Sequence, residues 1–195
     1  MRFTEKKKFK AALFDFDGTL FFTDRANYLS YSYAVSQEGY TLSEEEFIKV
    51  CSGKDYKTFL KLLYPDITEE QCKNIHFVKL DCYKNFYNEI TPNYSALTIA
   101  ECLKASMKLG IVTTATRKNV IEILDYYNIS DMFDFIISKE DVKNQKPSPE
   151  CYFQALKQLN ASSDEVIAFE DSDIGIEAAE KAIDFVYRLE HFGRA

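Results

Sequence analysis

The pattern of hydrophobic and polar positions changes twice along the chain. Residues 11–16 form a short apolar run, AALFDF, which predicts a buried strand that ends at an aspartate-rich turn. From residue 24 to about residue 89, apolar residues recur at helical spacing with almost no strand pattern. From residue 94 onward, helical segments alternate with short apolar segments. Strands that alternate with helices of this length predict a parallel sheet with helices on both faces.

The alternating part predicts four helices, each followed by a strand. The helices are expected at residues 96–109, 118–127, 149–159 and 174–182, and the strands at residues 110–114, 133–138, 165–171 and 184–189. The fold class is therefore α/β, with a Rossmann-like parallel sheet flanked by helices. We expect the core domain to comprise residues 1–22 and 94–195, and residues 23–93 to form an inserted, all-helical cap domain.

The insertion carries its own helix signals. Ser43 is followed three positions later by Glu46, which is the pattern of a capping box. Thr68 is a candidate N-cap of one long helix over residues 67–90. The insertion follows directly from the strand that carries the aspartates, and ligands of open α/β sheets bind at the carboxyl ends of the strands. It is therefore placed to cover a site at that edge of the sheet.

Composition and charge narrow the class of protein. The chain has 195 residues, 46% of them hydrophobic, which is enough for a buried core. A formal net charge of −7 disfavours a nucleic-acid-binding protein but is compatible with a phosphorylated small-molecule substrate. Five cysteines without a CxxC spacing predict reduced thiols. No segment has the length of a secretory signal or of a membrane span, so we expect a soluble, cytoplasmic protein without a membrane partner, and a monomer by default.

Each of the first four predicted core strands ends in, or leads to, polar side chains. The first ends in Asp15 and Asp17, the second ends in Thr113 and Thr114, the third leads to Lys146, and the fourth ends in Glu170 and Asp171. In a parallel sheet these sets converge on one edge. Carboxylate oxygens suit Mg²⁺. A metal, hydroxyl groups and a lysine together suit a phosphoryl group, which a carboxylate can attack. The sequence therefore predicts a magnesium and phosphate site.

The same residues lie in four motifs that resemble those of a known family. DFDGTL, which begins at Asp15, resembles the first motif of the haloacid dehalogenase superfamily. The strand ending in Thr113, the segment KPSPE from Lys146, and EDSDIGIEAA from Glu170 resemble the second, third and fourth motifs, in the same order. The chain looks like a phosphatase of this superfamily, similar to the phosphoglycolate phosphatases, with a small helical cap.

The resemblance implies catalytic roles for the aspartates. Asp15 would be the nucleophile that forms an aspartyl-phosphate. Asp17 would be the general acid that protonates the leaving oxygen and then the base that activates water. The expected cofactor is Mg²⁺, held by Asp15, Glu170, Asp171 and the backbone carbonyl of Asp17.

The resemblance also implies groups that hold the substrate. Thr113 and the amide of Thr114 would bind phosphate oxygens, and Lys146 would bridge the nucleophile and the phosphate. Gly18 is also expected to bind the substrate, and as a glycine it supports a bend near Asp17 that would separate the roles of the two aspartates. Gly53 and Lys54 would lie on the cap loop that faces the substrate.

The motif details favour a phosphatase and leave alternatives open. Asp17 disagrees with the dehalogenases and phosphonatases of the superfamily, which usually lack this second aspartate. The sugar phosphomutases carry a histidine where Asn27 stands here. A phosphomutase or a pyrophosphatase remains an alternative to a phosphatase, as does a non-catalytic regulatory protein on the same scaffold. Phe22 stands where many members carry aspartate, which leaves the substrate open.

Overall fold

The structure, a computed structural model, describes residues 9–51 and 54–189 and divides the chain into two compact units. Unit 1 contains the described residues up to Phe22 and those from Pro92 onward. Unit 2 contains the described residues between them. No helix in the described ranges combines the length and the apolar character that crossing a membrane requires.

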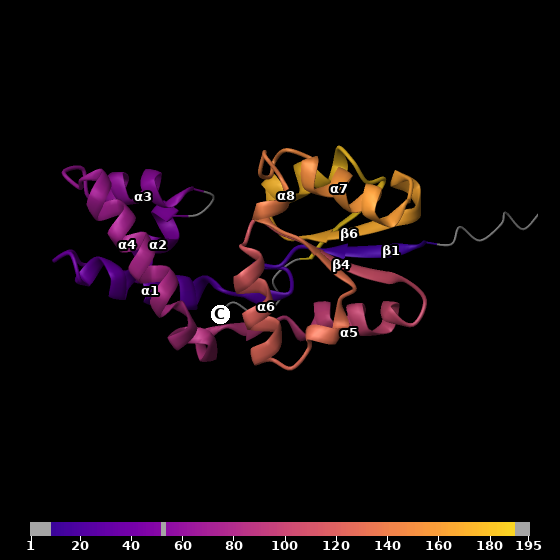
Figure 1. Ribbon diagram of the computed structural model, residues 1–195, viewed down its shortest axis with the longest axis horizontal. Helices are drawn as coiled ribbons and strands as arrows, with labels where there is room; N and C mark the ends of the chain where they lie inside the picture. Colours follow the sequence, from indigo (N-terminus) through magenta and orange to yellow (C-terminus); the bar gives the residue numbers. More distant parts are fainter. Residues whose placement is uncertain (1–8, 52–53, 190–195) are drawn as a thin grey trace, which may run out of the picture. The chain divides into compact units, whose positions relative to one another are not determined.

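Unit 1 is built on a parallel sheet of five strands in the order β5-β4-β1-β6-β7 (Figure 1). The strands are β1 (Ala11–Phe14), β4 (Lys108–Val112), β5 (Phe135–Ile137), β6 (Val166–Glu170) and β7 (Phe185–Arg188). The helices are α5 (Tyr94–Lys104), α6 (Arg117–Tyr126), α7 (Glu150–Leu159) and α8 (Asp173–Glu180), with short 3-10 turns η2 (Ser130–Met132), η3 (Lys139–Asp141) and η4 (Ser163–Glu165). The predicted α/β fold class is confirmed.

Helices cover both faces of this sheet. Figure 1 shows α7 and α8 on one face and α5 and α6 on the other. Under α7 and α8, Leu13 of β1 and Ala168 of β6 pack against Tyr152 and Ala178, and all four are buried. Strands of a parallel sheet are buried on both faces and therefore read as continuous apolar runs. This burial explains the uninterrupted AALF sequence of β1.

The strand order reverses at β1: the next two strands in the chain are added on one side of β1, and the last two are added on the other side. Phe14, the last residue of β1, is in register with Ile111 of β4 on one side and with Phe169 of β6 on the other. After β4 the chain moves outward to β5, and it then returns to β6 beyond β1. Ligands bind at such a switch point, outside the carboxyl ends of the strands. The fold therefore brings the residues after β1, β4 and β6 to one place.

The predicted element boundaries are wrong around β4. The sequence pattern extends the first core helix to residue 109, whereas α5 ends at Lys104 and β4 begins at Lys108. Lys108 and Leu109 pair with Ala11 and Ala12 of β1, and the Lys108 N–H donates to the Lys10 carbonyl at 2.9 Å. Strand pairing thus outweighs the helical pattern of this segment.

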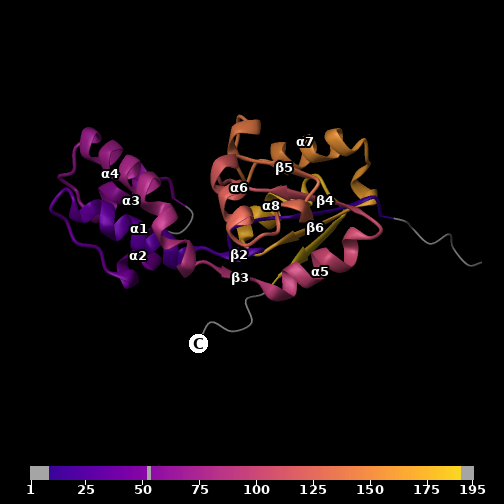
Figure 2. The same ribbon diagram turned by 60° about the horizontal axis from the view of Figure 1, so that its bottom comes forward.

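Unit 2 is helical (Figure 2). It has its own hydrophobic core. Its elements are α1 (Asp24–Ser36), α2 (Glu44–Cys51), α3 (Tyr56–Leu63), α4 (Glu69–Cys82) and the 3-10 segment η1 (Tyr83–Glu89). Both predicted caps form: Ser43 and Glu46 bond reciprocally, and Thr68 does so with Gln71. The single helix predicted over residues 67–90 is wrong, because α4 ends at Cys82 and gives way to the tighter segment η1, within which Phe86 has non-helical dihedrals.

A short two-stranded sheet that the sequence pattern did not predict lies at the unit boundary. It pairs β2 (Phe21–Phe22) with β3 (Thr91–Pro92). The next residue, Asn93, donates from its backbone to the Leu20 carbonyl at 2.8 Å and from its side chain to the Thr19 carbonyl at 2.9 Å. These bonds explain why unit 1 resumes at Pro92, two residues before the start expected from the sequence.

Candidate active site

Asp15 is held at the carboxyl end of β1. Its N–H donates to the Phe169 carbonyl at 3.0 Å, which extends the pairing of β1 with β6 by one residue. Its side chain is buried, with 7% of the residue exposed. The following residue, Phe16, is fully buried, and its ring packs 5.0 Å from that of Phe21. Asp17 comes next and is exposed. The two aspartates therefore differ sharply in their access to water.

Gly18 makes the predicted bend, and its neighbours admit no side chain. Its φ of +91° lies in the region that favours glycine. A Cβ atom at this position would lie 2.2 Å from Oδ2 of Asp171, which is too close for any contact. The next residue, Thr19, donates from its hydroxyl to Oδ1 of Asp171 at 3.1 Å. The loop after β1 thus packs directly on the acidic residue that follows β6.

Lys146 lies buried between the ends of three strands. Its Nζ donates to Oδ1 of Asp15 at 2.6 Å, to Oε1 of Glu170 at 2.6 Å, and to the Val112 carbonyl at 2.8 Å. An ammonium group has three protons to donate, so these three acceptors occupy all of them. Lys146 therefore connects β1, β4 and β6 at the carboxyl edge of the sheet.

The loop that carries Lys146 is fixed by a residue of α7. The Glu150 carboxylate accepts hydrogen bonds from the N–H groups of Lys143 and Asn144, at 2.8 and 3.0 Å. These bonds lower the pKa of the Glu150 carboxyl below its usual value. The segment that leads to Lys146 is thus anchored to the start of α7.

Glu170, the last residue of β6, is a fully buried carboxylate. Its Oε1 accepts from Lys146 and from the hydroxyl of Tyr152 on α7. Its Oε2 has no hydrogen-bond partner among the described residues and lies against Gly175, where a Cβ atom would be only 2.0 Å away. A buried carboxylate oxygen without a donor is costly unless a positive group meets it.

Three carboxylates form an acidic cluster that can hold a metal ion. Asp15, Glu170 and Asp171 each offer an oxygen, and these oxygens lie within 4.8 Å of one another. Hard divalent cations take oxygen ligands of this kind. The unpartnered oxygen of Glu170 and the excess of carboxylates over the one ammonium both fit a cation. We call these three residues the acidic cluster, and it is a candidate site for a divalent cation.

Burial and charge shift the protonation of Asp15 and Lys146 in the same direction. Burial raises the pKa of the Asp15 carboxyl well above its usual value, Lys146 opposes this shift, and Glu170 and Asp171 add to it. Burial lowers the pKa of Lys146, but Asp15 and Glu170 outweigh it and the net shift is upward. Lys146 therefore stays charged, and a bound cation would favour the ionised form of Asp15.

Thr113 is the first residue after β4, and it follows Val112, whose carbonyl accepts a hydrogen bond from Lys146. The Thr113 N–H donates to the Ile137 carbonyl of β5 at 2.9 Å. Its hydroxyl oxygen accepts from the Ala115 N–H at 3.0 Å. A hydroxyl that accepts in this way keeps its own proton to donate to a ligand. Thr114, the next residue, is exposed at the same edge.

The structure brings some predicted site residues together and leaves others apart. Asp15, Lys146, Glu170 and Asp171 meet in one network, whereas the exposed carboxylate of Asp17 is not part of the acidic cluster. Gly53 lies outside the described residues. Lys54 is an exposed residue of unit 2, and its predicted role is untested.

Three residues of the network escaped the sequence analysis. They are Thr19, Tyr152 and Arg188, whose side chains contact the acidic cluster or its backbone. Thr19 belongs to the first motif and could have been found there. Tyr152 and Arg188 lie on a helix and an edge strand, where an aromatic or basic residue carries no functional signal of its own.

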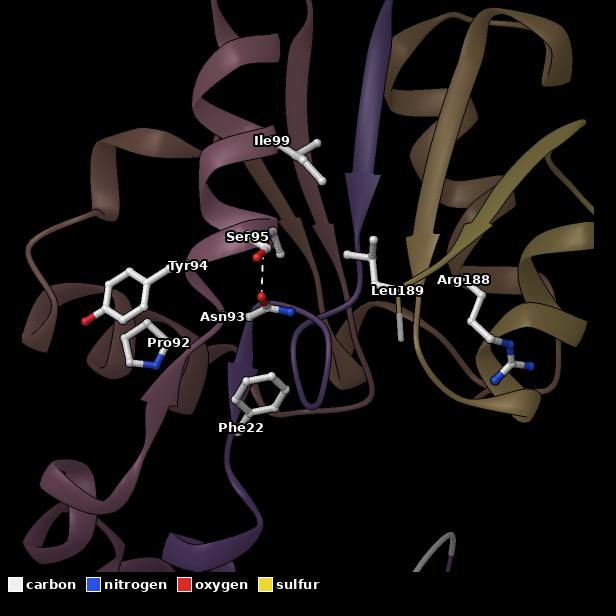
Figure 3. Close-up of a pocket in the computed structure, with 9 residues that line it drawn as sticks. Phe22, Pro92, Asn93, Tyr94, Ser95, Ile99, Arg188 and Leu189 are labelled. Carbon is white, nitrogen blue, oxygen red and sulfur yellow. Dashed lines mark hydrogen bonds between the residues drawn. The ribbon is translucent and has the colours of Figure 1, made fainter. Parts of the chain in front are cut away.

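A cavity of about 620 Å³ lies between β2, β3 and the start of α5 on one side and the end of β7 on the other (Figure 3). Figure 3 shows Phe22 and Asn93 on one side of it and Arg188 and Leu189 on the other. Arg188 donates to the Asp171 carbonyl at 2.7 Å and to Oδ1 of Asp173 at 2.6 Å. This wall of the cavity therefore ties the Asp171 loop to β7.

The fold and the site define an α/β protein with a cluster of acidic residues at the carboxyl edge of a parallel sheet. The sequence profile of the haloacid dehalogenase-like hydrolases matches residues 12–186. The chain therefore belongs to the haloacid dehalogenase-like hydrolase family, as its motifs predicted.

Two named relatives and a solved structure agree with this assignment. The chain is 28% identical over 188 residues to a phosphorylated carbohydrates phosphatase of Thermotoga maritima, a match that covers 93% of this chain and 86% of the relative. It is 30% identical over 184 residues to the pyrophosphatase PpaX of Bacillus velezensis, covering 90% and 81%. The crystal structure of a putative beta-phosphoglucomutase from Thermotoga maritima matches with a TM-score of 0.77 and 26% identity, covering 95% of this chain and 88% of the other.

Proposed function

We propose that the chain is a Mg²⁺-dependent phosphatase that hydrolyses a small phosphate monoester through an aspartyl-phosphate on Asp15. The observation that carries this proposal is the bridge that Lys146 makes between Asp15 and Glu170 inside the acidic cluster. The phosphatases among its relatives support the same reaction class.

In the first step, a carboxylate oxygen of Asp15 attacks the phosphorus atom and the bond from phosphorus to the leaving oxygen breaks. Asp17, exposed to solvent two residues further on, gives its proton to that leaving oxygen. Lys146 and the Thr113 hydroxyl neutralise and orient the phosphoryl oxygens. The products of this step are an alcohol and an aspartyl-phosphate on Asp15.

In the second step, water attacks the phosphorus atom of the aspartyl-phosphate. Asp17, now ionised, accepts a proton from the water, and the bond from phosphorus to Asp15 breaks. Phosphate leaves and Asp15 is restored as a carboxylate. The exposure of Asp17 suits this role, because it must exchange protons with both the leaving group and water.

The acidic cluster and the Asp17 carbonyl would hold the metal ion. Bound Mg²⁺ would neutralise the phosphoryl oxygens and the carboxylates around them. Oxygen-only ligands and a mixture of carboxylate and carbonyl donors suit Mg²⁺ better than softer metals.

We further propose that residues 23–93 serve as the cap that selects the substrate, with Gly53 and Lys54 on the loop that meets it. The position of this helical unit in the chain, directly after the loop that carries Asp15 and Asp17, supports a cap. Closure of such a cap would exclude bulk water during the first step.

A pyrophosphatase is the second candidate. The relatives named pyrophosphatase PpaX support it, one of them at 30% identity over 184 residues. The same residues would act, with phosphate as the leaving group in place of an alcohol. Release of phosphate from inorganic pyrophosphate, compared with release from sugar phosphates and phosphoglycolate, would separate the two activities.

The proposal predicts that Asp15→Asn abolishes turnover. Asparagine has nearly the same shape as aspartate but is not a nucleophile, so we expect hydrolysis of p-nitrophenyl phosphate to fall by at least about 10³-fold. The wild type should require Mg²⁺ and lose its activity in excess EDTA.

Asp184→Asn is the matched control, because Asp184 is an exposed carboxylate before β7, at the opposite edge of the sheet. It should retain the activity of the wild type. A wild type inactive towards every phosphate in the panel, or an active Asp15→Asn variant, would contradict the proposal.

A further inference from the structure

Tyr152 is a polar residue buried among apolar side chains. It lies in the first turn of α7 and is fully buried against the sheet, in a cluster with Leu13, Ala155 and Ala168. Its hydroxyl donates to Oε1 of Glu170. Phenylalanine would fill the same apolar space without bringing a hydroxyl into the core, and a buried phenol needs a partner. The hydroxyl is therefore placed for its bond to Glu170.

The same oxygen of Glu170 also accepts from Lys146. Lys146 shares its three protons among Oε1 of Glu170, Oδ1 of Asp15 and the Val112 carbonyl. In the proposed reaction the ammonium group of Lys146 must also interact with the phosphoryl oxygens. Glu170 competes for that charge, because a buried carboxylate attracts the nearest ammonium strongly.

We infer that Tyr152 is a positioning residue that shares Glu170 with Lys146. By donating to Oε1, the hydroxyl supplies part of the hydrogen bonding that this carboxylate needs. Lys146 is then less tightly bound by Glu170 and stays available to Asp15 and to the phosphoryl group. The same bond fixes the rotation of the Glu170 carboxylate, so that its unpartnered Oε2 keeps its place beside Gly175.

This inference rests on the proposed function for its effect on turnover, but not for its effect on metal binding. Partners that orient a metal-binding carboxylate typically change metal affinity or activity by 10–100-fold when they are removed. Loss of the Tyr152 hydroxyl should therefore weaken Mg²⁺ binding as well as lower kcat.

The test is Tyr152→Phe, which removes one oxygen atom and keeps the ring. We expect kcat for p-nitrophenyl phosphate at saturating Mg²⁺ to fall by roughly 10–100-fold. KM should change less than about twofold, because Tyr152 does not touch the substrate. The dissociation constant of Mg²⁺, measured by isothermal titration calorimetry, should rise about tenfold or more.

Ala155→Gly is the matched control for a loss of stability. Ala155 is buried one turn further along α7 and contributes no polar group. This variant should lower the melting temperature and leave kcat and Mg²⁺ binding unchanged. A Tyr152→Phe variant that behaves like Ala155→Gly would overturn the inference.

A double-mutant cycle that combines Tyr152→Phe with Glu170→Gln tests whether Tyr152 acts through Glu170. Once Glu170 has lost its charge, Tyr152→Phe should add less than about twofold to the loss in Mg²⁺ affinity. If Tyr152→Phe lowered the Mg²⁺ affinity equally in the wild type and in the Glu170→Gln variant, Tyr152 would not act through Glu170, and the inference would be overturned.

A second probe keeps the test open if Tyr152→Phe does not fold. 3-Fluorotyrosine in place of Tyr152 retains the hydroxyl, and its fluorine resonance should shift when Mg²⁺ is added. No shift would overturn the inference. A wild type that binds Mg²⁺ but hydrolyses no phosphate ester would overturn the proposed function alone, whereas a wild type that binds no Mg²⁺ would overturn both.

Discussion

Gly175 determines where the Glu170 carboxylate can lie. It sits in the first turn of α8, and a Cβ atom there would be 2.0 Å from Oε2 and 2.4 Å from Cδ of Glu170. Glu170 is fully buried and bonded on its other oxygen, so it cannot swing away. The acidic cluster therefore depends on a residue that has no side chain at all.

Gly175→Ala should destabilise the protein and weaken Mg²⁺ binding. Alanine is ordinarily favoured over glycine in a helix by about 1 kcal/mol, so a net loss would show the cost of the clash. We expect a loss of roughly 1–3 kcal/mol in the free energy of unfolding. Urea unfolding and calorimetric titration with Mg²⁺ measure the two effects.

Gly39→Ala is the control for this variant. Gly39 also resists substitution, because its φ is +82°, but a Cβ atom there would meet nothing within 4 Å. It lies in unit 2, beyond α1. We expect it to lower stability and leave Mg²⁺ affinity unchanged. Unchanged Mg²⁺ affinity in Gly175→Ala would show that the carboxylate tolerates the displacement.

At the scale of elements, the 3-10 turn η3 shows how a connection of the core is stabilised. Oδ2 of Asp141 accepts from the N–H and the hydroxyl of Ser138, at 2.7 and 2.6 Å, and from Arg117 at 2.5 Å. Burial tends to raise the pKa of the Asp141 carboxyl, but these donors outweigh it and the net shift is downward from 3.8.

The lowered pKa predicts a stability that depends on pH. Because the folded state favours the ionised carboxylate, its contribution is present above the unfolded pKa and is lost as pH falls through the folded pKa. Asp141→Asn should therefore cost about 1–2 kcal/mol at pH 7. The difference from the wild type should shrink below roughly pH 4. Urea unfolding at pH 7, 5 and 3 measures it, and a penalty that stays constant would exclude a role for the charge.

The sequence predicts the core elements well and their connections poorly. Continuous apolar runs identify β1 and β6, because a strand that is buried on both faces of a parallel sheet is apolar at successive positions. The start of β4 was misplaced because Lys108 and Leu109 fit a helix locally and join the sheet only through β1. The pairing of β2 with β3 joins segments about seventy residues apart, which no local pattern encodes.

The candidate site also contains residues that the local sequence predicts and residues that only the three-dimensional packing reveals. Asp15, Lys146, Glu170 and Asp171 could be predicted because they lie at or beyond the carboxyl ends of strands that converge. Tyr152 could not, because a tyrosine inside an apolar helix face has the same pattern as any core residue. Its hydroxyl gains meaning only from the three-dimensional packing of α7 on β6.

At the scale of the whole molecule, each of the two units has a hydrophobic core of its own among the described residues. In unit 1, residues of β1, β4 and β6 pack against α7 and α8. In unit 2, residues of α1, α2, α3 and α4 pack on one another, with Leu60 and Ile75 fully buried. Each core can therefore be weakened without a substitution in the other.

Ile75→Ala should lower the stability of unit 2 and spare the metal site. Truncating a buried isoleucine costs roughly 2–5 kcal/mol. We expect calorimetric unfolding to show two transitions, of which Mg²⁺ raises only the one that belongs to unit 1. Ile75→Ala should lower the other. Ile183→Ala, in the core of unit 1, is the matched variant and should lower the Mg²⁺-sensitive transition.

A single transition that both variants lower equally would show that the two cores unfold as one. Loss of Mg²⁺ binding in Ile75→Ala would likewise contradict the separation. Either result would mean that a substitution that destabilises unit 2 also destabilises the acidic cluster in unit 1.

Asn93 marks where the chain re-enters unit 1, beside the point where it left. Its bonds to the carbonyls of Thr19 and Leu20, together with the pairing of β2 and β3, bring the exit and the entry of the chain side by side. An insertion between adjacent points places no tension on the sheet, whatever its length. Evolution could therefore exchange one insert for another, or lengthen it, while the same catalytic core is inherited intact.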